Sequence, residues 1–112
     1  MENNSYHGNC PALETIALIG GRWKVIILHV LSKHDRRFGE INVRIPGISK
    51  KVLTEQLREL EADGLISRKQ YKELAPKVEY ALTDFGKSLC PLLTYISAWN
   101  NNNPISQARI PT

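Results

Sequence analysis

The clearest pattern along the chain is an amphipathic helix at residues 49–66, which read SKKVLTEQLRELEADGLI. Apolar residues recur there at helical spacing and form one face, made of Val52, Leu53, Leu57 and Leu60. Ser49 can cap the first turn of this helix. Gly64 suits the left-handed position after the last turn, where a Schellman motif packs Leu65 on Leu60. Both ends of the helix are therefore predicted.

The opposite face of this helix is polar and is predicted to be available for recognition. Winding the chain at about 100° per residue places on that face Lys51, Thr54, Glu55, Arg58 and Ala62. The first turn is basic and the last two turns are acidic, which opposes the helix dipole at a cost of a few tenths to about 1 kcal/mol per charge. The charges are Lys50 and Lys51, then Glu59, Glu61 and Asp63. This arrangement fits a helix that enters a DNA groove by its N-terminus, and it equally fits an ordinary solvated face.

Two further apolar helices are predicted near the start of the chain. Pro11 is favoured in a first turn and makes Cys10 the N-cap of a short helix that Gly20 and Gly21 end. The face of this helix expected to point inward consists of Leu13, Ile16 and Ala17. Residues 22–32, RWKVIILHVLS, are apolar nearly all round. They predict a helix buried on most sides at the centre of the core.

A short helix and a tight turn are predicted between the central helix and residue 49. Residues 36–38 form a short strand in this prediction, and Gly39 caps a helix whose inward side chains are Phe38, Ile41 and Ile45. Pro46 and Gly47 then turn the chain toward Ser49. Two helices joined by a tight turn, with the second amphipathic and basic at its start, are typical of a helix-turn-helix.

A hairpin is predicted directly after the amphipathic helix. Residues 66–71 and 78–83 form its strands, because Val78, Tyr80 and Leu82 alternate as in a half-buried strand. The strands and their connection carry Arg68, Lys69, Lys72 and Lys77. A solvated loop would carry such residues as well, but the order of the elements favours a wing placed over DNA phosphates or in the minor groove.

A last helix is predicted from Thr83, which can cap it, with Asp84 correctly signed for the first turn. Pro91 should kink this helix or split it at Cys90. Its apolar stripe is long and consists of Phe85, Leu89, Leu92, Leu93, Ile96 and Trp99. The stripe is predicted to meet a second subunit, and the alternative is that it folds back on the chain's own core.

The length and composition of the chain indicate a single domain, and its positive charge favours an anionic partner. The chain has 112 residues, 42% of them hydrophobic, a net charge of +4 and a pI near 9.2. We expect residues 1–9 to be a flexible N-terminus, residues 10–99 to form the domain, and residues 100–112 to be a flexible tail. No apolar run reaches the roughly 20 residues of a membrane span, and no signal peptide is recognisable, so a cytoplasmic protein with no membrane contact is expected.

The cysteines and histidines point to one reactive residue and to no metal. A thiol at a helix N-terminus tends toward thiolate, which makes Cys10 a candidate reactive cysteine. The alternative is that it is only a small residue that begins a helix. Cys90 is expected to be less reactive, on a partly buried helix with weaker help from the dipole. The spacing of His7, His29 and His34 fits no structural zinc site. No cofactor and no enzyme are predicted, because no phosphate loop or catalytic arrangement is present.

These segments together resemble the HxlR-type family of bacterial winged helix-turn-helix regulators. The resemblance spans residues 10–99 and rests on the Cys-Pro start, IGGRW, ISKKVLTEQLRELEADGLI and VEYALTDFGKSL, which follow one another in family order. It implies a homodimeric DNA-binding transcription factor with dimer contacts from the first and last helices. It also implies that Cys10 corresponds to the thiol that some members use to sense oxidants or electrophiles, whereas other members sense differently.

The sequence thus predicts a mainly helical α+β protein, a winged helix-turn-helix with additional dimerisation helices at both ends. The expected partner is a near-palindromic double-stranded DNA operator, bound through Ser49, Lys50, Lys51, Thr54, Glu55, Arg58, Arg68, Lys69, Lys72 and Lys77. The expected homodimer interface consists of Leu13, Ile16, Leu89, Leu92, Leu93, Ile96 and Trp99. The alternative function is a winged-helix module for protein–protein contact. Binding that weakens steeply with salt would distinguish DNA from that alternative.

Overall fold

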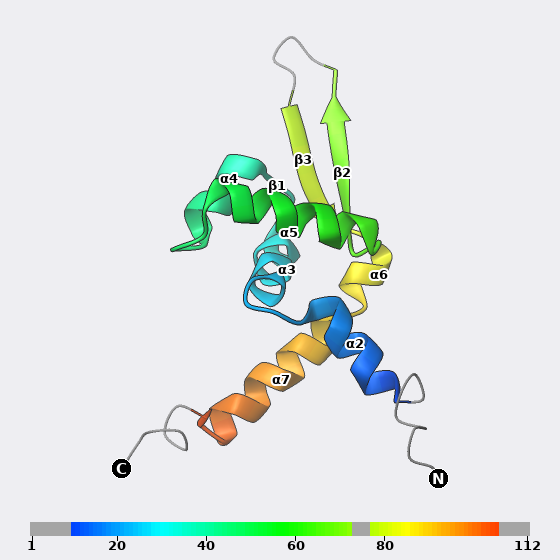
Figure 1. Cartoon of the computed structure of the whole chain (residues 1–112), viewed down its shortest axis with the longest axis vertical. Coiled ribbons are helices and arrows are strands. Elements are labelled where there is room, and N and C mark those ends of the chain that lie inside the picture. Colours follow the sequence, from blue (N-terminus) through cyan, green and yellow to red (C-terminus); the bar gives the residue numbers. More distant parts are fainter. Residues whose placement is uncertain (1–9, 73–76, 106–112) are drawn as a thin grey trace.

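The computed structural model describes residues 10–72 and 77–105 and confirms a mainly helical α+β fold with a small antiparallel sheet. In chain order its elements are α2 (Pro11–Ile19), α3 (Lys24–Lys33), β1 (Arg36–Arg37), α4 (Phe38–Arg44), α5 (Lys50–Ala62), β2 (Ile66–Tyr71), β3 (Lys77–Leu82), α6 (Asp84–Lys87) and α7 (Cys90–Asn102). The molecule is elongated, with extents of 58 × 38 × 25 Å. The β2–β3 hairpin projects from one end of a central body, and α2 and α7 diverge from the other end (Figure 1).

The core lies between α3, α4, α5 and the base of the sheet. Its largest fully buried side chains come from these elements and the segments that join them: Ile27, Leu28, Ile41, Ile45, Leu53, Leu57, Leu60, Leu65 and Ile66. The three leucines of the predicted apolar face of α5 are all among them. The amphipathic helix therefore packs its apolar face inward, as predicted, and leaves its polar face outside.

Both predicted ends of α5 are confirmed. The backbone N–H of Val52 donates to Oγ of Ser49 at 3.1 Å. At the other end Gly64 has φ of +80°, and the Leu65 N–H donates to the Leu60 carbonyl at 3.0 Å. This is the long bond of a Schellman motif. Leu60 and Leu65 are both fully buried, as the motif predicts.

The sheet has three strands, because the short strand predicted at residues 36–38, observed as Arg36–Arg37, pairs with the predicted hairpin. Its order is β1–β3–β2 and both pairings are antiparallel, with Arg36 opposite Tyr80 and Arg68 opposite Tyr80 on the other side. The third strand is the pair Arg36–Arg37, which crosses back to the hairpin. The strand β3 begins at Lys77, one position earlier than predicted, and Thr83 follows it as the confirmed cap of α6, accepting from the Gly86 N–H at 3.0 Å.

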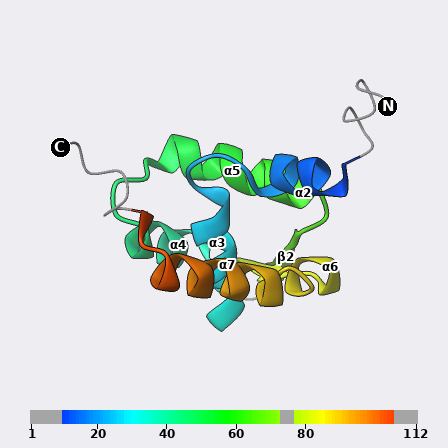
Figure 2. The ribbon, with the colours of Figure 1, turned by 90° about the horizontal axis from the view of Figure 1, so that it is seen from below.

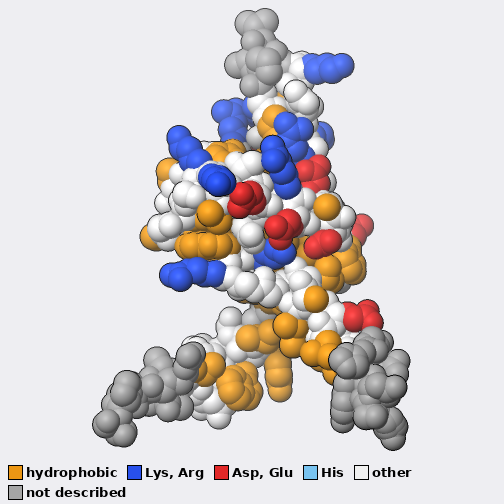
Figure 3. Space-filling model, viewed as in Figure 1, with side chains coloured by type: hydrophobic (Ala, Val, Ile, Leu, Met, Phe, Trp, Pro, Cys, Tyr) orange, Lys and Arg blue, Asp and Glu red, His pale blue; other side chains and the backbone are white. Residues whose placement is uncertain are grey.

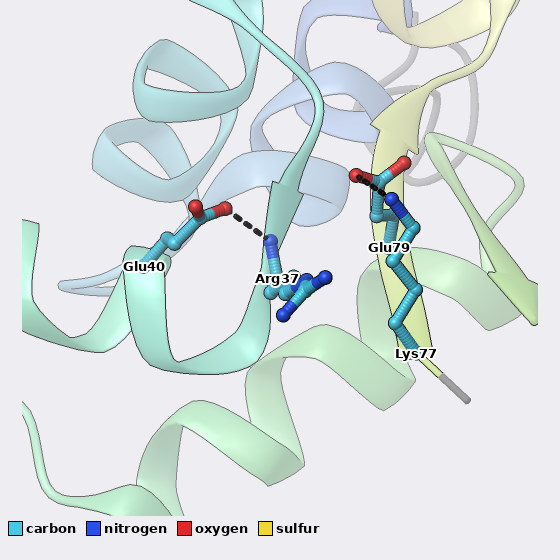
Figure 4. Close-up of polar contacts among 4 residues, drawn as sticks. All are labelled: Arg37, Glu40, Lys77 and Glu79. Carbon is cyan, nitrogen blue, oxygen red and sulfur yellow. Dashed lines mark hydrogen bonds and ion pairs between the residues drawn. The ribbon is translucent and has the colours of Figure 1, made fainter. Parts of the chain in front are cut away.

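The start of α4 differs from the prediction. Arg37, and not Gly39, is the N-cap, and Phe38 is the first helical residue. The reason is a hydrogen bond at the helix start, in which the Arg37 N–H donates to Oε1 of Glu40 at 2.8 Å (Figure 4). This bond lowers the pKa of Glu40, and the charges of Arg37, Arg44 and Arg36 lower it further. The interaction is therefore present at neutral pH and is lost when acid protonates the carboxyl group.

The predicted burial of the two N-terminal helices is partly wrong. In α2 the side chains expected to point inward are exposed, with Leu13 at 51% and Ile16 at 59%, and Ala17 is exposed too. This helix meets the core through Leu18 and Ile19 at its end instead. One face of α3 is exposed as well, since Val25 is 40% and Ile26 is 36% accessible. The physical reason is that α2 diverges from the body and so cannot bury its own apolar face.

The predicted split at Pro91 is confirmed, because α6 ends at Lys87 and α7 begins at Cys90. Within the described residues, none of the α7 side chains is fully buried. The helix continues to Asn102, so residues 100–102 are helical and not part of a tail. The expectations for residues 1–9 and 106–112 lie outside the described residues.

Candidate nucleic-acid interface

The polar face of α5 is the centre of the candidate interface. Lys51, Glu55 and Arg58 are exposed on it, and Ser49 and Lys50 are exposed at its start. Thr54 is half-buried, and its hydroxyl donates to the Lys50 carbonyl at 2.8 Å. The structure thus brings the predicted α5 residues together on one accessible surface. Lys and Arg side chains gather around α4, α5 and the hairpin (Figure 3). Hydrophobic side chains gather around α2 and α7 (Figure 3).

The turn between α4 and α5 holds the two helices in a defined relation. Gly47 has φ of +87°, a conformation that favours glycine. Ile45 and Ile48 on either side of the turn are buried, and Nδ2 of Asn42 donates to the Ile48 carbonyl at 3.4 Å. The local chemistry of the turn therefore sets the angle at which α5 is presented.

The register of the sheet separates the predicted wing residues. Lys69 and Arg37 both lie opposite Glu79, whereas Arg68 lies opposite Tyr80, one position along β3. Because successive side chains of a strand point to opposite faces, Lys69 lies on one face of the sheet and Arg68 on the other. The predicted wing residues therefore do not form a single basic surface.

Lys77 is held by neighbours on its own face of the sheet. Its ammonium lies 4.8 Å from the centroid of the Tyr71 ring and 3.7 Å from Oε2 of Glu79. The Lys69 ammonium lies 5.2 Å from the same ring. Lys77 and Glu79 are drawn in Figure 4. Lys72, next to this group in the chain, is exposed and stands at the edge of the described hairpin.

Glu59 has a partner that sequence reasoning missed. Nζ of Lys24 lies 2.7 Å from its carboxylate, and the Lys24 side chain is only 11% exposed. The ion pair joins α3 to α5, so part of the acidic charge at the end of α5 serves the fold. The signal in the sequence was a single lysine within an otherwise apolar helix, since a buried ammonium requires a partner.

Three arginines beside the interface were also missed. Arg36 and Arg37 lie in β1 and Arg44 ends α4. Nε of Arg36 donates to the Val30 carbonyl at 3.3 Å, and Nη1 of Arg44 donates to the Glu40 carbonyl at 3.1 Å. Their positive charge adds to that of α5, and the Arg36–Arg37 pair was the visible signal.

The two cysteines stand in similar positions, which corrects the expected contrast between them. Cys10 is the N-cap of α2, and Cys90 is the first residue of α7. Both are free thiols with intermediate exposure. Weaker help from the dipole therefore does not distinguish Cys90, because each thiol lies at a helix N-terminus.

Residues 10–72 and 77–105 contain neither a group of metal ligands nor a single helix that could span a membrane. No group of three or more His, Cys, Asp or Glu side chains within these ranges could hold a metal ion. No single helix there is long and apolar enough to cross a membrane, although α2 and α3 together, bent by 76°, meet that test by length and composition.

The residues predicted for dimerisation fall into two groups. Leu13, Ile16, Leu92, Ile96 and Trp99 are exposed, with Trp99 at 51%. Leu89 and Leu93 are partly buried against the core. The exposed group lies on α2 and α7, which lie on opposite sides of the molecule when it is seen from below (Figure 2).

A helix-turn-helix followed by an antiparallel hairpin, with α5 presented outward, defines a winged helix-turn-helix protein. A family model described as HxlR-like helix-turn-helix matches residues 18–107. The chain belongs to this family, and it is accordingly a transcriptional regulator of the helix-turn-helix type and not an enzyme. The resemblance stated from the sequence is therefore confirmed.

Similar proteins agree with this assignment. The uncharacterised HTH-type transcriptional regulator YdeP of Bacillus subtilis is 47% identical over 90 residues, covering 80% of this chain and 70% of YdeP. The redox regulator HypR in its reduced form has a TM-score of 0.81 at 39% identity, covering 88% of this chain and 98% of HypR. The reduced transcriptional regulator YodB of B. subtilis has a TM-score of 0.76 at 40% identity, covering 82% of this chain and 91% of YodB.

Proposed function

We propose that the chain is a cytoplasmic homodimer that regulates transcription by binding a near-palindromic DNA operator. The observation that carries this proposal is the separation of two surfaces (Figure 3). The exposed cations of the hairpin and the polar face of α5 lie toward one end of the molecule, and exposed apolar side chains of α2 and α7 lie at the other. Two copies joined through the apolar end present two reading helices to successive half-sites.

Within α5 the residues take different roles. Ser49, Lys50 and Lys51 stand at the N-terminus, where free amides and cations favour phosphate oxygens. Thr54, Glu55 and Arg58 follow along the outward face, where side chains reach base edges in the major groove. The planar fork of Arg58 suits the two acceptors of guanine, and Glu55 suits the amino group of cytosine.

The hairpin supplies further phosphate contacts. Arg68, Lys69, Lys72 and Lys77 are its proposed cations. Lys72 is the most direct of them because it is exposed near the tip, whereas Lys77 already interacts with Tyr71 and Glu79. These residues are proposed to act on both faces of the hairpin, since the register divides them.

Binding to the DNA upstream of the protein's own gene tests the proposal. A fragment that contains an inverted repeat should bind with an affinity that falls steeply with salt, because several phosphates are neutralised. A scrambled fragment serves as the control. Binding that depends little on salt, or that requires a protein partner, would favour the protein–protein module instead.

Arg58→Ala is expected to weaken operator binding by about 1–3 kcal/mol and to relax the preference at one base pair. Lys72→Ala is expected to weaken all DNA sequences alike and to reduce the salt slope by about one unit. Lys87→Ala, an exposed lysine on α6, is the matched control and should bind as wild type. Fluorescence anisotropy on a set of single-base operator variants measures all three. Identical sequence profiles for Arg58→Ala and Lys72→Ala would contradict this division of roles.

Thiol sensing through Cys10 is the finer part of the proposal. Cys10 is a free thiol at the N-terminus of α2, a helix proposed to lie at the subunit boundary. A thiolate there reacts with oxidants and electrophiles, and a modification at that boundary would shift one reading helix against the other. The similarity to HypR, named as a redox regulator, supports this role.

Diamide treatment is expected to change operator affinity in wild type and not in Cys10→Ser. Cys90→Ser is the matched control, because Cys90 also begins a helix, and it should respond as wild type does. Anisotropy before and after treatment gives the affinity, and mass spectrometry locates the modified thiol. If diamide changed operator affinity in Cys10→Ser but not in Cys90→Ser, the sensing residue would be Cys90 and not Cys10.

A further inference from the structure

An open groove of about 600 Å³ lies between α3 and α7. Its apolar lining includes Val25 and Ile26 of α3 and Leu93 of α7, and Thr94 and Ser97 add hydroxyl groups. The volume is typical of small-molecule sites, which span about 300–1,000 Å³. The groove also accounts for the exposed face of α3, since Val25 and Ile26 form its wall.

The charged groups that line this groove all have the same sign. These groups are Arg22 and Lys33, and in the part of the chain that the structure describes no acidic side chain lines the groove. The Arg22 guanidinium lies 5.1 Å from the centroid of the Trp23 ring, a contact that restrains it beside the groove. An apolar wall with cations beside it complements a small molecule that is apolar along its body and negative at one end.

We propose that the α3–α7 groove is a binding site for a small amphipathic organic anion, such as an aromatic carboxylate. Its body would pack on Val25, Ile26 and Leu93. Its carboxylate would lie near Arg22 and Lys33, whose guanidinium and ammonium groups line the groove. The site is separate from the cations of α5 and the hairpin that are proposed to bind DNA.

The groove is also connected to the reading helix. Val25 lines the groove, and the preceding residue, Lys24, pairs with Glu59 of α5 at 2.7 Å. Leu28 lines the groove and at the same time packs in the core, where it is 1% exposed. A molecule bound against α3 would therefore shift a helix that contacts α5 and so change how α5 is presented to DNA. On this proposal the groove is an effector site. This regulatory part depends on the operator binding proposed above.

The charge requirement is tested with 1-naphthylacetate and its neutral amide, 1-naphthylacetamide, by calorimetry on the full chain. Wild type is expected to bind the acetate about tenfold more tightly than the amide, which corresponds to about 1.4 kcal/mol. Arg22→Gln/Lys33→Gln should bind the two equally. Lys87→Gln, which removes an exposed lysine outside the groove, should behave as wild type. Equal binding of the two compounds by wild type would overturn the proposal.

The location is tested by filling the groove and by following Cys90, which lines it. Thr94→Trp should lose acetate binding while keeping the circular dichroism spectrum and thermal transition of wild type. The acetate should slow alkylation of Cys90 by iodoacetamide several-fold and leave Cys10 unaffected. The Cys90 measurement uses wild type, so it decides the matter even if Thr94→Trp fails to fold. An unprotected Cys90 in the presence of bound acetate would overturn the site.

A second copy of the chain is the competing occupant. If the acetate bound only to a monomeric variant, the partner would fill the groove and the proposal would be wrong.

For the regulatory part, the acetate should change operator affinity at least about fivefold in wild type and not in Arg22→Gln/Lys33→Gln. Unchanged operator affinity with bound acetate would reject the regulatory part alone. Failure of the protein to bind any operator would reject the proposed function, and the calorimetry would still judge the site.

Discussion

Leu92→Asp/Ile96→Asp is expected to produce a folded monomer whose operator affinity is lower by roughly 100-fold or more. Both side chains are exposed on α7, at 39% and 48%, so the substitutions place charge on the surface of the single chain without opening its core. In the proposed dimer the same carboxylates would be buried without partners, which costs several kcal/mol. The affinity falls because two half-sites are then bound by two independent readers instead of two tethered ones.

The matched control is Ala98→Asp/Asn101→Asp. It adds the same charge to the same helix, but helical winding places these two positions on the other side of α7 from Leu92 and Ile96. The control should sediment as a dimer and bind the operator as wild type. Sedimentation velocity, circular dichroism and anisotropy distinguish the two proteins. An intact dimer of Leu92→Asp/Ile96→Asp would show that subunits meet through another surface.

Gly86→Ala is expected to destabilise the fold by about 3 kcal/mol or more, because the new methyl group has no room. A Cβ at this position would overlap the carbonyl group of Leu65 and touch the Leu82 side chain. Those atoms belong to the Schellman end of α5 and the end of β3, so neither can move without disturbing the core. In a domain whose total stability is about 5–15 kcal/mol, this loss is a large share.

Gly39→Ala is the opposite case on the same chain. A Cβ at Gly39 meets nothing within 4 Å among the described residues, and the position lies inside α4. Alanine is favoured over glycine in a helix, so this substitution should stabilise the protein by about 0.5–1 kcal/mol. Urea unfolding with a common m-value measures both. Equal stability of the two variants would mean that the packing around Gly86 does not control the fold.

Local chemistry allowed the sequence to predict α5 almost completely. Caps depend on residues within a few positions of each helix end, so Ser49 and Gly64 identified both ends without reference to the rest of the molecule. The same holds for Thr83 before α6 and for Pro91, whose ring ends one helix and begins another. The predicted start of α4 was wrong for a related reason. The Glu40 side chain accepts a hydrogen bond from the Arg37 N–H, so the N-cap is Arg37 and not Gly39.

The sequence also determined which residues face outward on α5, since helical winding follows from spacing alone. It did not determine which face of the hairpin each cation occupies. That depends on the pairing partner, and a shift of one residue moves a side chain to the other face. Arg68 and Lys69 are neighbours in the sequence and lie on opposite faces for this reason. The sequence predicted a short strand at residues 36–38, but only the folded sheet reveals that it pairs with β3, because that contact joins segments distant in the chain.

What only the tertiary structure decided are the contacts between segments distant in sequence. Apolar spacing marked α2 and α7 as amphipathic, but spacing is the same whether a face meets its own core or another molecule. The diverging path of α2 decided that Leu13 and Ile16 are exposed. The partner of Lys24 is Glu59, far along the chain, and no local pattern connects them. The groove that contains Cys90 exists because α3 and α7 pack together without filling the space between them, which is a property of their packing and not of either sequence.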